Sequence, residues 1–331
     1  VTIVPIDIAN SKDSIDIKIR VLDSWTLIPT GSLSSSESSA KLTERNILGF
    51  GHLISGNIKN RFDTKERAVY AQYSINNIKN TYIRLDLDYA NDYNNDSKRS
   101  ININRPFYSV ITKNAGGAFF ENRLRTEQFP VLDTISLQNV SYDFQEYWYG
   151  RAFKINPKSN PERYFNNMVL ALTYNQKVFG QMPAAVLDPT SYFSNEKNWI
   201  GMIGFSKQKF YQDKFVFNYN ITEDIPYGEN IALIVGHQEK NSNSRLYTGL
   251  SVSFGRKYSF GYASGFAEWG SFYDAGLTEQ ITFKLGLNYF SPLISWGNWR
   301  FRQFVKPTYV WGNNRDDSFK DRLTLLDEDG L

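Results

Sequence analysis

Residues 81–90, TYIRLDLDYA, alternate strictly between apolar and polar side chains. The two sets are Ile83, Leu85 and Leu87 on one side and Arg84, Asp86 and Asp88 on the other. Because successive side chains of a strand point to opposite faces, this segment has one face suited to hydrocarbon and one suited to water. The pattern recurs in segments of about ten residues, the length of a tilted membrane strand, whereas soluble strands usually have about five or six. The sequence therefore predicts an all-β fold, an antiparallel transmembrane β-barrel in meander order.

The alternation predicts about 11 to 13 strands between residues 45 and 331. They cover residues 49–60, 67–77, 80–90, 116–124, 140–154, 165–176, 198–207, 213–221, 229–238, 245–254, 258–269, 277–290 and 298–311. Long polar loops are expected at 91–104 and 181–197, with tight turns between other strands. The side chains expected to face lipid are Ile83, Leu85, Leu87, Phe215, Phe217, Ile281, Phe283 and Leu285. Those expected to face the lumen are Arg84, Asp86, Asp88, Lys284, Arg300 and Arg302.

The composition excludes several classes of protein. Mean hydropathy is -0.45, and the longest apolar runs fall far short of the roughly 20 residues that a membrane-spanning helix needs. Aromatic residues make up 16% of the chain, which suits the interfacial girdles of a barrel. A net charge of +3, with both signs evenly mixed, argues against a nucleic-acid partner. The absence of Cys excludes disulfides, thiolate metal sites and a Cys nucleophile.

Motifs for catalysis or cofactor binding are absent from the sequence. The two histidines, His52 and His237, lie in expected strands without other ligand-type residues at metal-binding spacing. No nucleotide-binding, serine-hydrolase or zinc-protease motif occurs, and acidic clusters such as Glu223-Asp224 suit solvated turns. We therefore expect no catalytic residue, cofactor or metal, and a function carried out by shape, strand edges or passage. A large soluble β-sandwich or adhesin remains a competing interpretation, and it would bury the faces assigned to lipid.

The N-terminal part of the chain has a different character. Residues 14–22, SIDIKIRVL, alternate like a strand of a small half-buried sheet. Residues 33–41, LSSSESSAK, form a serine-rich stretch that suits a flexible crossing or a polar strand edge. These features place a domain boundary between about residues 23 and 45, with residues 1–30 belonging to a separate unit and its linker.

Several segments together resemble the outer-membrane protein insertase superfamily that includes BamA, TamA and the two-partner-secretion transporters, also described as bacterial surface antigens. The most specific piece is TERNILGFGH at residues 43–52. Residues 14–27 resemble the last strand of a periplasmic POTRA domain, and residues 302–331 resemble the strand that opens the family's long sixth extracellular loop. The Arg-Gly-Phe/Tyr motif of that loop does not occur before Leu331. Because a barrel must close in lipid, we expect further strands from residues beyond this chain.

The resemblance implies a function and a place in the cell. It implies a bacterial outer-membrane protein that inserts client barrels through a lateral gate by strand templating, with outer-membrane lipid, unfolded clients and accessory envelope lipoproteins as partners. By position, the expected first barrel strand would form that gate, with the residues Gly49, Gly51, Leu53, Ser55, Gly56 and Asn57. The alternatives are a polypeptide or solute translocation pore and the membrane anchor of a fused hydrolase.

Overall fold

One large antiparallel sheet dominates the computed structural model, which describes residues 2–7, 15–21, 25–109, 111–131, 134–155, 165–218, 221–315 and 318. Sequence neighbours pair along the whole sheet, so the predicted all-β fold and meander order are confirmed. The described residues contain no α-helix, only the short 3-10 turns η1 (Ile47–Gly49), η2 (Ile78–Asn80) and η3 (Tyr93–Asn95). None of the helical segments in these ranges is long and apolar enough to cross a membrane.

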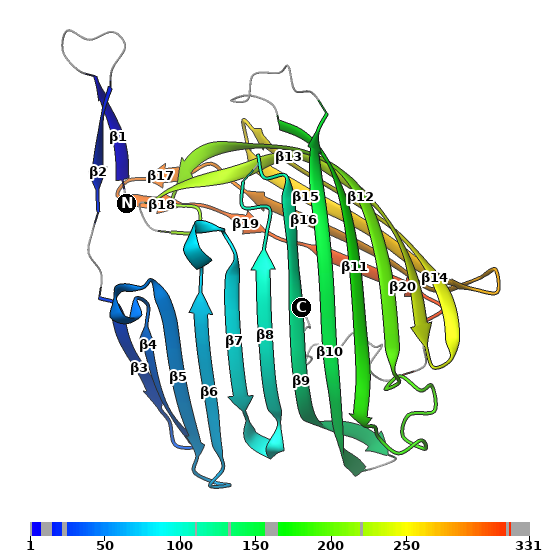
Figure 1. Cartoon of the computed structure of the whole chain (residues 1–331). Coiled ribbons are helices and arrows are strands. Elements are labelled where there is room, and N and C mark those ends of the chain that lie inside the picture. Colours follow the sequence, from blue (N-terminus) through cyan, green and yellow to red (C-terminus); the bar gives the residue numbers. More distant parts are fainter. Residues whose placement is uncertain are drawn as a thin grey trace.

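The sheet contains sixteen strands (Figure 1). The first eight are β3 (Leu27–Leu33), β4 (Glu37–Glu44), β5 (His52–Arg61), β6 (Arg67–Ile75), β7 (Arg84–Asn91), β8 (Ser97–Arg105), β9 (Asn114–Val131) and β10 (Thr134–Lys154). The other eight are β11 (Phe165–Gln181), β12 (Glu196–Lys214), β13 (Thr222–Lys240), β14 (Asn243–Tyr258), β15 (Gly261–Asp274), β16 (Leu277–Phe290), β19 (Phe304–Val305) and β20 (Thr308–Asn313). We call the end of the sheet where β3 begins the proximal end and the opposite end the distal end.

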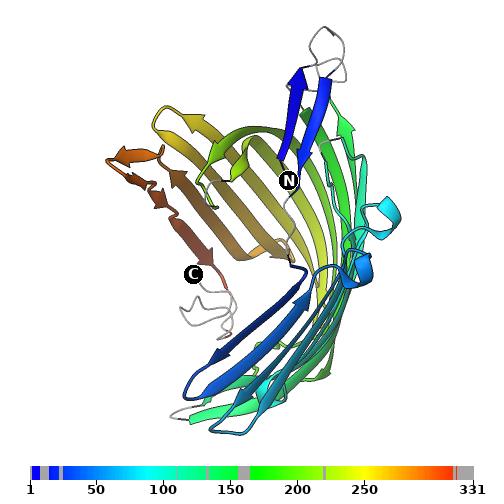
Figure 2. The same cartoon turned by 90° about the vertical axis from the view of Figure 1, so that its left-hand side faces the viewer.

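The sheet is strongly curved and open. Figure 2 shows a gap between β3 and the line formed by β19 and β20, which both pair with β16. Each edge contains a proline, Pro29 in β3 and Pro307 between β19 and β20. Proline has no N–H to donate to a ladder and is therefore found on edge strands or at bulges. The Pro307 carbonyl still accepts a hydrogen bond from the Leu287 N–H at 3.0 Å, so the edge line continues through the proline.

Two small hairpins lie outside the large sheet. In one, β1 (Thr2–Asp7) pairs with β2 (Ile15–Arg20), so the extended structure expected for residues 15–20 is present. Figure 1 shows this hairpin beyond the proximal end. In the other, β17 (Ile294–Trp296) pairs with β18 (Trp299–Phe301) between β16 and β19. Neither hairpin by itself establishes a POTRA domain.

The structure corrects several predicted boundaries. The large sheet begins at Leu27 instead of residue 45, because the serine-rich segment pairs as the β3–β4 hairpin. Its Ser34 hydroxyl accepts the Glu37 N–H at 2.9 Å and closes the turn. The expected loop at 91–104 is mostly β8, and the expected strand at 298–311 is divided among β18, β19 and β20. The sheet therefore has more strands than the 11 to 13 predicted.

Strand order also bears on the expected sixth loop. The connections that lie at the distal end before β20 are β3–β4, β5–β6, β7–β8, β9–β10, β11–β12, β13–β14 and β15–β16. β20 therefore ends at Asn313 after seven distal connections, and most of residues 314–331, on which the expected sixth loop depends, lie outside the described residues. The acidic residues Asp327, Glu328 and Asp329 lie outside the described residues.

Candidate functional site

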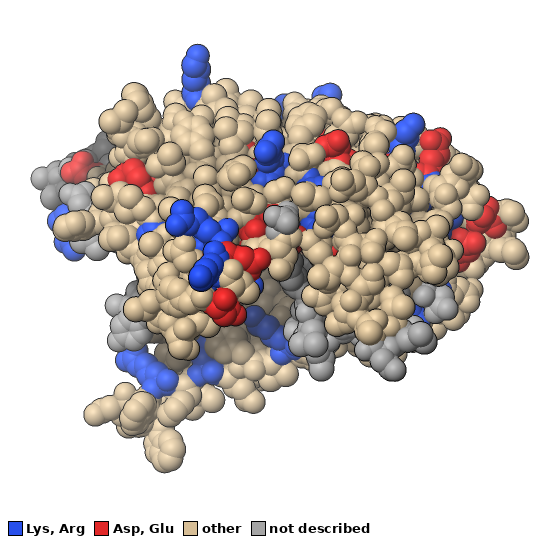
Figure 3. Space-filling view, turned by 90° about the horizontal axis from the view of Figure 1, so that it is seen from below, with Lys and Arg blue, Asp and Glu red and all other residues tan. Residues whose placement is uncertain are grey.

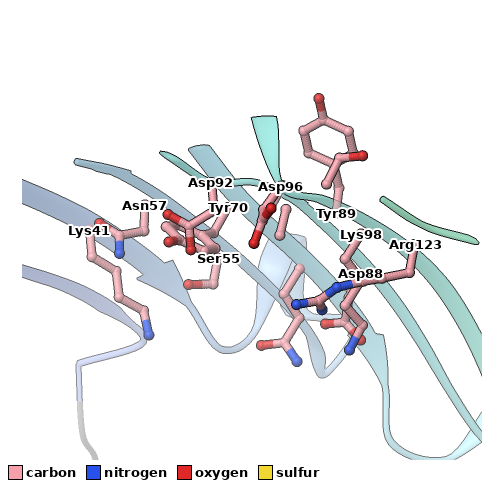
Figure 4. A pocket seen from close by; sticks show the side chains of 14 residues that line it. Lys41, Ser55, Asn57, Tyr70, Asp88, Tyr89, Asp92, Asp96, Lys98 and Arg123 are labelled. Atoms are coloured by element: carbon pink, nitrogen blue, oxygen red, sulfur yellow. The ribbon is translucent and has the colours of Figure 1, made fainter. Parts of the chain in front are cut away.

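The sheet has two chemically different faces, which the strand register separates. Figure 4 shows Lys41, Asp88, Lys98 and Arg123 on the concave side of the curved sheet, whereas Tyr89 points away from it. Partners in an antiparallel register share a face, so this assignment extends from strand to strand as far as β16. We call the two sides the concave face and the convex face.

The concave face of β6 to β10 carries a chain of polar contacts. The carboxylate of Asp86 accepts the Ser74 hydroxyl at 2.7 Å and the Arg84 Nε–H at 2.8 Å. Further along the same face, Glu121 lies 3.4 Å from the Lys98 ammonium and accepts the Tyr142 hydroxyl at 3.0 Å. These contacts cross from strand to strand, so polar side chains here satisfy one another. The predicted lumen-facing residues Arg84, Asp86 and Asp88 all lie on this face.

A depression of about 510 Å³ occupies the distal part of this polar wall (Figure 4). Its charged lining residues are Lys41, Asp88, Asp92, Asp96, Lys98 and Arg123. Seen from the distal end in Figure 3, Lys, Arg, Asp and Glu side chains gather beside the hollow of the molecule. Acids and bases alternate within a few residues of each other, so the wall suits water and mixed charges rather than one anion or cation.

The convex face is an apolar band. On β13 it presents Ile231, Leu233 and Val235, and all three are exposed. Their register partners on β12 and β14 are also mainly apolar, for example Ile203 and Leu250 beside Leu233. The exposed apolar side chains continue across the sheet on this face, including Ile54, Leu87, Ile101, Phe120, Leu172, Phe205, Val252, Phe254, Leu285, Leu287 and Trp311. A β-sandwich would cover such a face, but no second sheet covers it in the described ranges.

Charged residues mark the limits of the apolar band. Glu229 and Glu239 flank it on β13, ten residues apart. This spacing corresponds to about 33 Å along a strand and about 25 Å along a membrane normal at a tilt of about 40°. Glu229 lies 3.8 Å from Arg256 of the neighbouring strand, and both side chains are exposed. The band therefore has the height of the apolar belt of an outer-membrane barrel.

The predicted lipid-facing residues divide into two groups. Leu85, Leu87, Ile281, Phe283 and Leu285 lie on the convex face, and Ile83 immediately precedes β7. Phe215 and Phe217 do not, because residues 215–218 belong to the connection between β12 and β13. The expected strand at 213–221 is therefore wrong.

The proximal ends of β12 and β13 form an inward-folded hairpin (Figure 2). Its described residues are 209–218 and 221–227, which we call the lid. The bend lies at Gly228, which has a φ of +144°. Ile225 and Val216 of the lid are buried against Tyr262 and Phe290. Because these two aromatic residues belong to concave-face positions of β15 and β16, the lid covers the concave side at the proximal end.

Polar contacts fix the lid at its tip and just beside the tip. The Glu223 carboxylate accepts the N–H groups of Val216 at 3.1 Å and Phe217 at 2.9 Å, so it closes the turn. Arg302, whose side chain is only 5% exposed, contacts Asp213 at 3.2 Å and donates to the Lys214 carbonyl at 3.2 Å. This ion pair joins the lid to the segment between β18 and β19.

The remaining predicted lumen residues have different surroundings. Lys284 lies on the concave face, with its ammonium 5.7 Å from the centre of the Phe266 ring. Arg302 is largely buried in its contact with Asp213, and it borders a depression of about 740 Å³ between the lid tip and the β17–β18 hairpin. Arg300 lies in the separate β17–β18 hairpin, with its guanidinium 5.6 Å from the centre of the Phe215 ring. The alternation at 298–311 therefore predicts the positions of these two arginines incorrectly, because the range is not one strand.

The expected gate strand is not at the edge of the sheet. Leu53, Ser55, Gly56 and Asn57 lie in β5, the third strand, which pairs with β4 and β6. Gly49 belongs to η1, and Gly51 lies immediately before β5. Both glycines have a positive φ and lie in the turn before the strand, whereas the sequence pattern placed them inside it. The alternation does not predict β3 or β4, because Pro29 and Gly31 interrupt β3 and most side chains of β4 are polar.

The edge of the sheet is formed by β3. In the described part of the chain its single neighbour is β4, with Ser32 opposite Ser39 and Thr30 opposite Lys41. One side of its backbone therefore has no ladder partner among these residues. An unpaired strand edge is a template for pairing with another chain.

A scan against protein-family models and a search of curated proteins found no match for the chain. Among the residues with described positions, no three His, Cys, Asp or Glu side chains lie together as a metal site. The two histidines contact hydroxyl groups, His52 that of Tyr73 at 2.7 Å and His237 that of Ser244 at 2.6 Å.

Proposed function

We propose that this chain is the barrel part of a bacterial outer-membrane protein that assembles client β-barrel proteins by strand templating at the β3 edge. The observation that carries the proposal is the combination of an exposed apolar convex face, a concave face that is polar along β6 to β10, and an open edge strand. The first two features suit a curved wall between lipid and water. The third supplies main-chain donors and acceptors for β-augmentation.

This mechanism uses backbone groups and does not require a catalytic side chain. An incoming client strand would hydrogen-bond to the free side of β3, and the apolar alternation of the client would select the register. Within hydrocarbon an unpaired backbone group costs several kcal/mol, so pairing at the edge is favourable for both chains. The residues of β3, and not the segment from Gly49 to Asn57, are therefore the proposed gate.

Disulfide trapping tests the edge directly, because the chain has no cysteine of its own. The full-length protein carrying Ser32→Cys would be incubated with an unfolded barrel client that has single cysteines along its terminal strand. Residues directly opposite on paired antiparallel strands have Cα atoms about 4.5–5.5 Å apart, which lies within the range of about 4.4–6.8 Å that a disulfide spans. The matched control is Ser39→Cys, the register partner of Ser32 on β4, one strand further from the client.

Ser32→Cys should capture the client at least several-fold more than Ser39→Cys, with a preferred client position. Depletion of the full-length protein should also lower the assembly of other barrel proteins in the cell. Equal capture by the two variants, together with normal levels of all other barrels after depletion, would reject the proposal.

A translocation pore is the second candidate, favoured by the charged concave face and by the lid that covers its proximal end. In planar bilayers a pore would give a stable channel, and Arg302→Gln should raise its conductance by loosening the lid from Asp213. Lys177→Gln is a suitable control, since Lys177 pairs with Glu196 on the concave face away from the lid. A barrel that conducts no current with either variant would exclude the pore.

A further inference from the structure

The β17–β18 hairpin has one apolar face. Its register places Trp296 opposite Trp299 and Ile294 opposite Phe301. All four side chains are exposed, with Trp296 at 78% and Trp299 at 71%. Because opposite residues in a two-stranded ribbon share a face, these four form a continuous apolar surface. The Trp299 and Phe301 rings lie nearly parallel on it, with centroids 6.4 Å apart.

The other face of the hairpin is polar and turned toward the lid. Ser295 and Arg300 are register partners on that face. The Arg300 guanidinium lies over the Phe215 ring at the tip of the lid. The tip of the lid therefore lies beside the polar side of the hairpin, and on the apolar side Trp299 borders the depression that Phe215 and Phe217 also line.

The hairpin continues an aromatic rim at the proximal end of the convex face. The Tyr258 and Phe260 rings are stacked with centroids 5.0 Å apart, and the Tyr289 hydroxyl donates to the Phe260 carbonyl at 2.7 Å. Tyr289 is the penultimate residue of β16, from which the chain runs into the hairpin. Figure 2 shows the hairpin projecting outward past the edge of the sheet, away from the enclosed space.

We infer that the β17–β18 hairpin is an interfacial membrane anchor whose partner is the phospholipid surface beside the β19–β20 edge. Tryptophan has an apolar body and an N–H donor, so it concentrates where hydrocarbon meets headgroups. A ribbon with one apolar and one polar face lies in the plane of that interface. The inference rests on the proposed function, since it requires that the convex band faces lipid.

Site-directed spin labelling tests the anchor and the barrel assignment separately. The full-length protein would be reconstituted into vesicles of phosphatidylethanolamine and phosphatidylglycerol, with one cysteine label at a time. The hairpin variants are Trp296→Cys on the apolar face and Ser295→Cys on the polar face. The barrel variants are Leu250→Cys on the convex face and Ser251→Cys on the concave face. Each label is scored by its accessibility to oxygen, which partitions into lipid, against a water-soluble nickel complex.

If the hairpin is an anchor, the oxygen-to-nickel accessibility ratio should be several-fold higher at position 296 than at position 295. The label at position 296 should also lie at a shallower depth in the bilayer than the label at position 250. A label at 296 that is freely accessible to the nickel complex, while the label at 250 is in lipid, would overturn the anchor and would not affect the barrel assignment. A label at 296 shielded from both reagents would show that protein covers the hairpin, which also overturns it. A label at 250 exposed to nickel would instead reject the barrel assignment on which the anchor depends.

Discussion

At the scale of single residues, Asp96 should make the stability of the folded protein depend on pH at the distal end of the sheet. It lies between η3 and β8, and its carboxylate accepts the Thr126 N–H at 2.6 Å. Burial raises the pKa of this carboxyl above its usual value, although that hydrogen bond and the nearby Arg123 and Arg125 act in the opposite direction. A raised pKa means that the folded protein binds the proton more tightly than the unfolded chain does. The associated stability is present below the ordinary pKa of about 3.9 and is lost as pH rises through the raised value.

Asp96→Asn should therefore remove this loss, because the amide oxygen still accepts the Thr126 N–H without carrying a buried charge. We expect the variant to gain stability relative to the unchanged protein as pH rises from about 4 toward neutrality. The measurement is the urea midpoint of the reconstituted protein across that range. Asp63→Asn, in the exposed turn after β5, is the control and should run parallel to the unchanged protein. A parallel profile for Asp96→Asn as well would contradict the assignment.

At the scale of elements, the lid depends on one backbone bend. Gly228 has φ +144°, and a Cβ added there would lie 1.8 Å from the Lys207 carbonyl oxygen. Gly228→Ala should cost about 1–3 kcal/mol of unfolding free energy through backbone strain alone. It should also expose Val216, which labelling of a Val216→Cys background with a maleimide would measure. Gly201→Ala is the control, because an added Cβ there meets only ordinary contacts at 3.7 Å. Equal labelling rates in the two variants would show that the lid does not depend on the bend.

The elements also show what the sequence could reveal. Strands such as β13 and β14 follow from strict alternation, because one face must be apolar over its whole height. The same pattern does not predict β3 and β4, since β3 contains the strand-breaking residues Pro29 and Gly31 and β4 is mostly polar. β8 is obscured by Asn and Asp around only two alternating isoleucines, Ile101 and Ile103. Residues 213–221 mislead in the opposite way, because Phe215 and Phe217 alternate yet belong to a turn that Glu223 closes.

At the scale of the whole molecule, the two faces of the sheet could be predicted and the position of its edge could not. Face assignment needs only the period of two along each strand, so Leu285 and Lys284 are correctly placed on opposite faces. Edge assignment depends on which strand lacks a second neighbour, and that is a property of pairing across the chain. The lid has the same origin, because the contact between Arg302 and Asp213 joins residues far apart in sequence.

The strongest test of the whole arrangement compares neighbouring residues on opposite faces. Leu250 lies near the middle of the apolar band beside Leu233 and Trp269, whereas Ser251 faces the concave side opposite Glu268. Arginine at a lipid-facing position near the bilayer midplane costs about 2–4 kcal/mol. Leu250→Arg should therefore lower the free energy of unfolding in lipid vesicles by that amount. Ser251→Arg should cost much less, because its guanidinium reaches water and the Glu268 carboxylate. Urea titrations of both variants, followed by the mobility difference between folded and heated protein on gels, give the comparison. If both arginines were tolerated equally, the convex face would not lie in lipid.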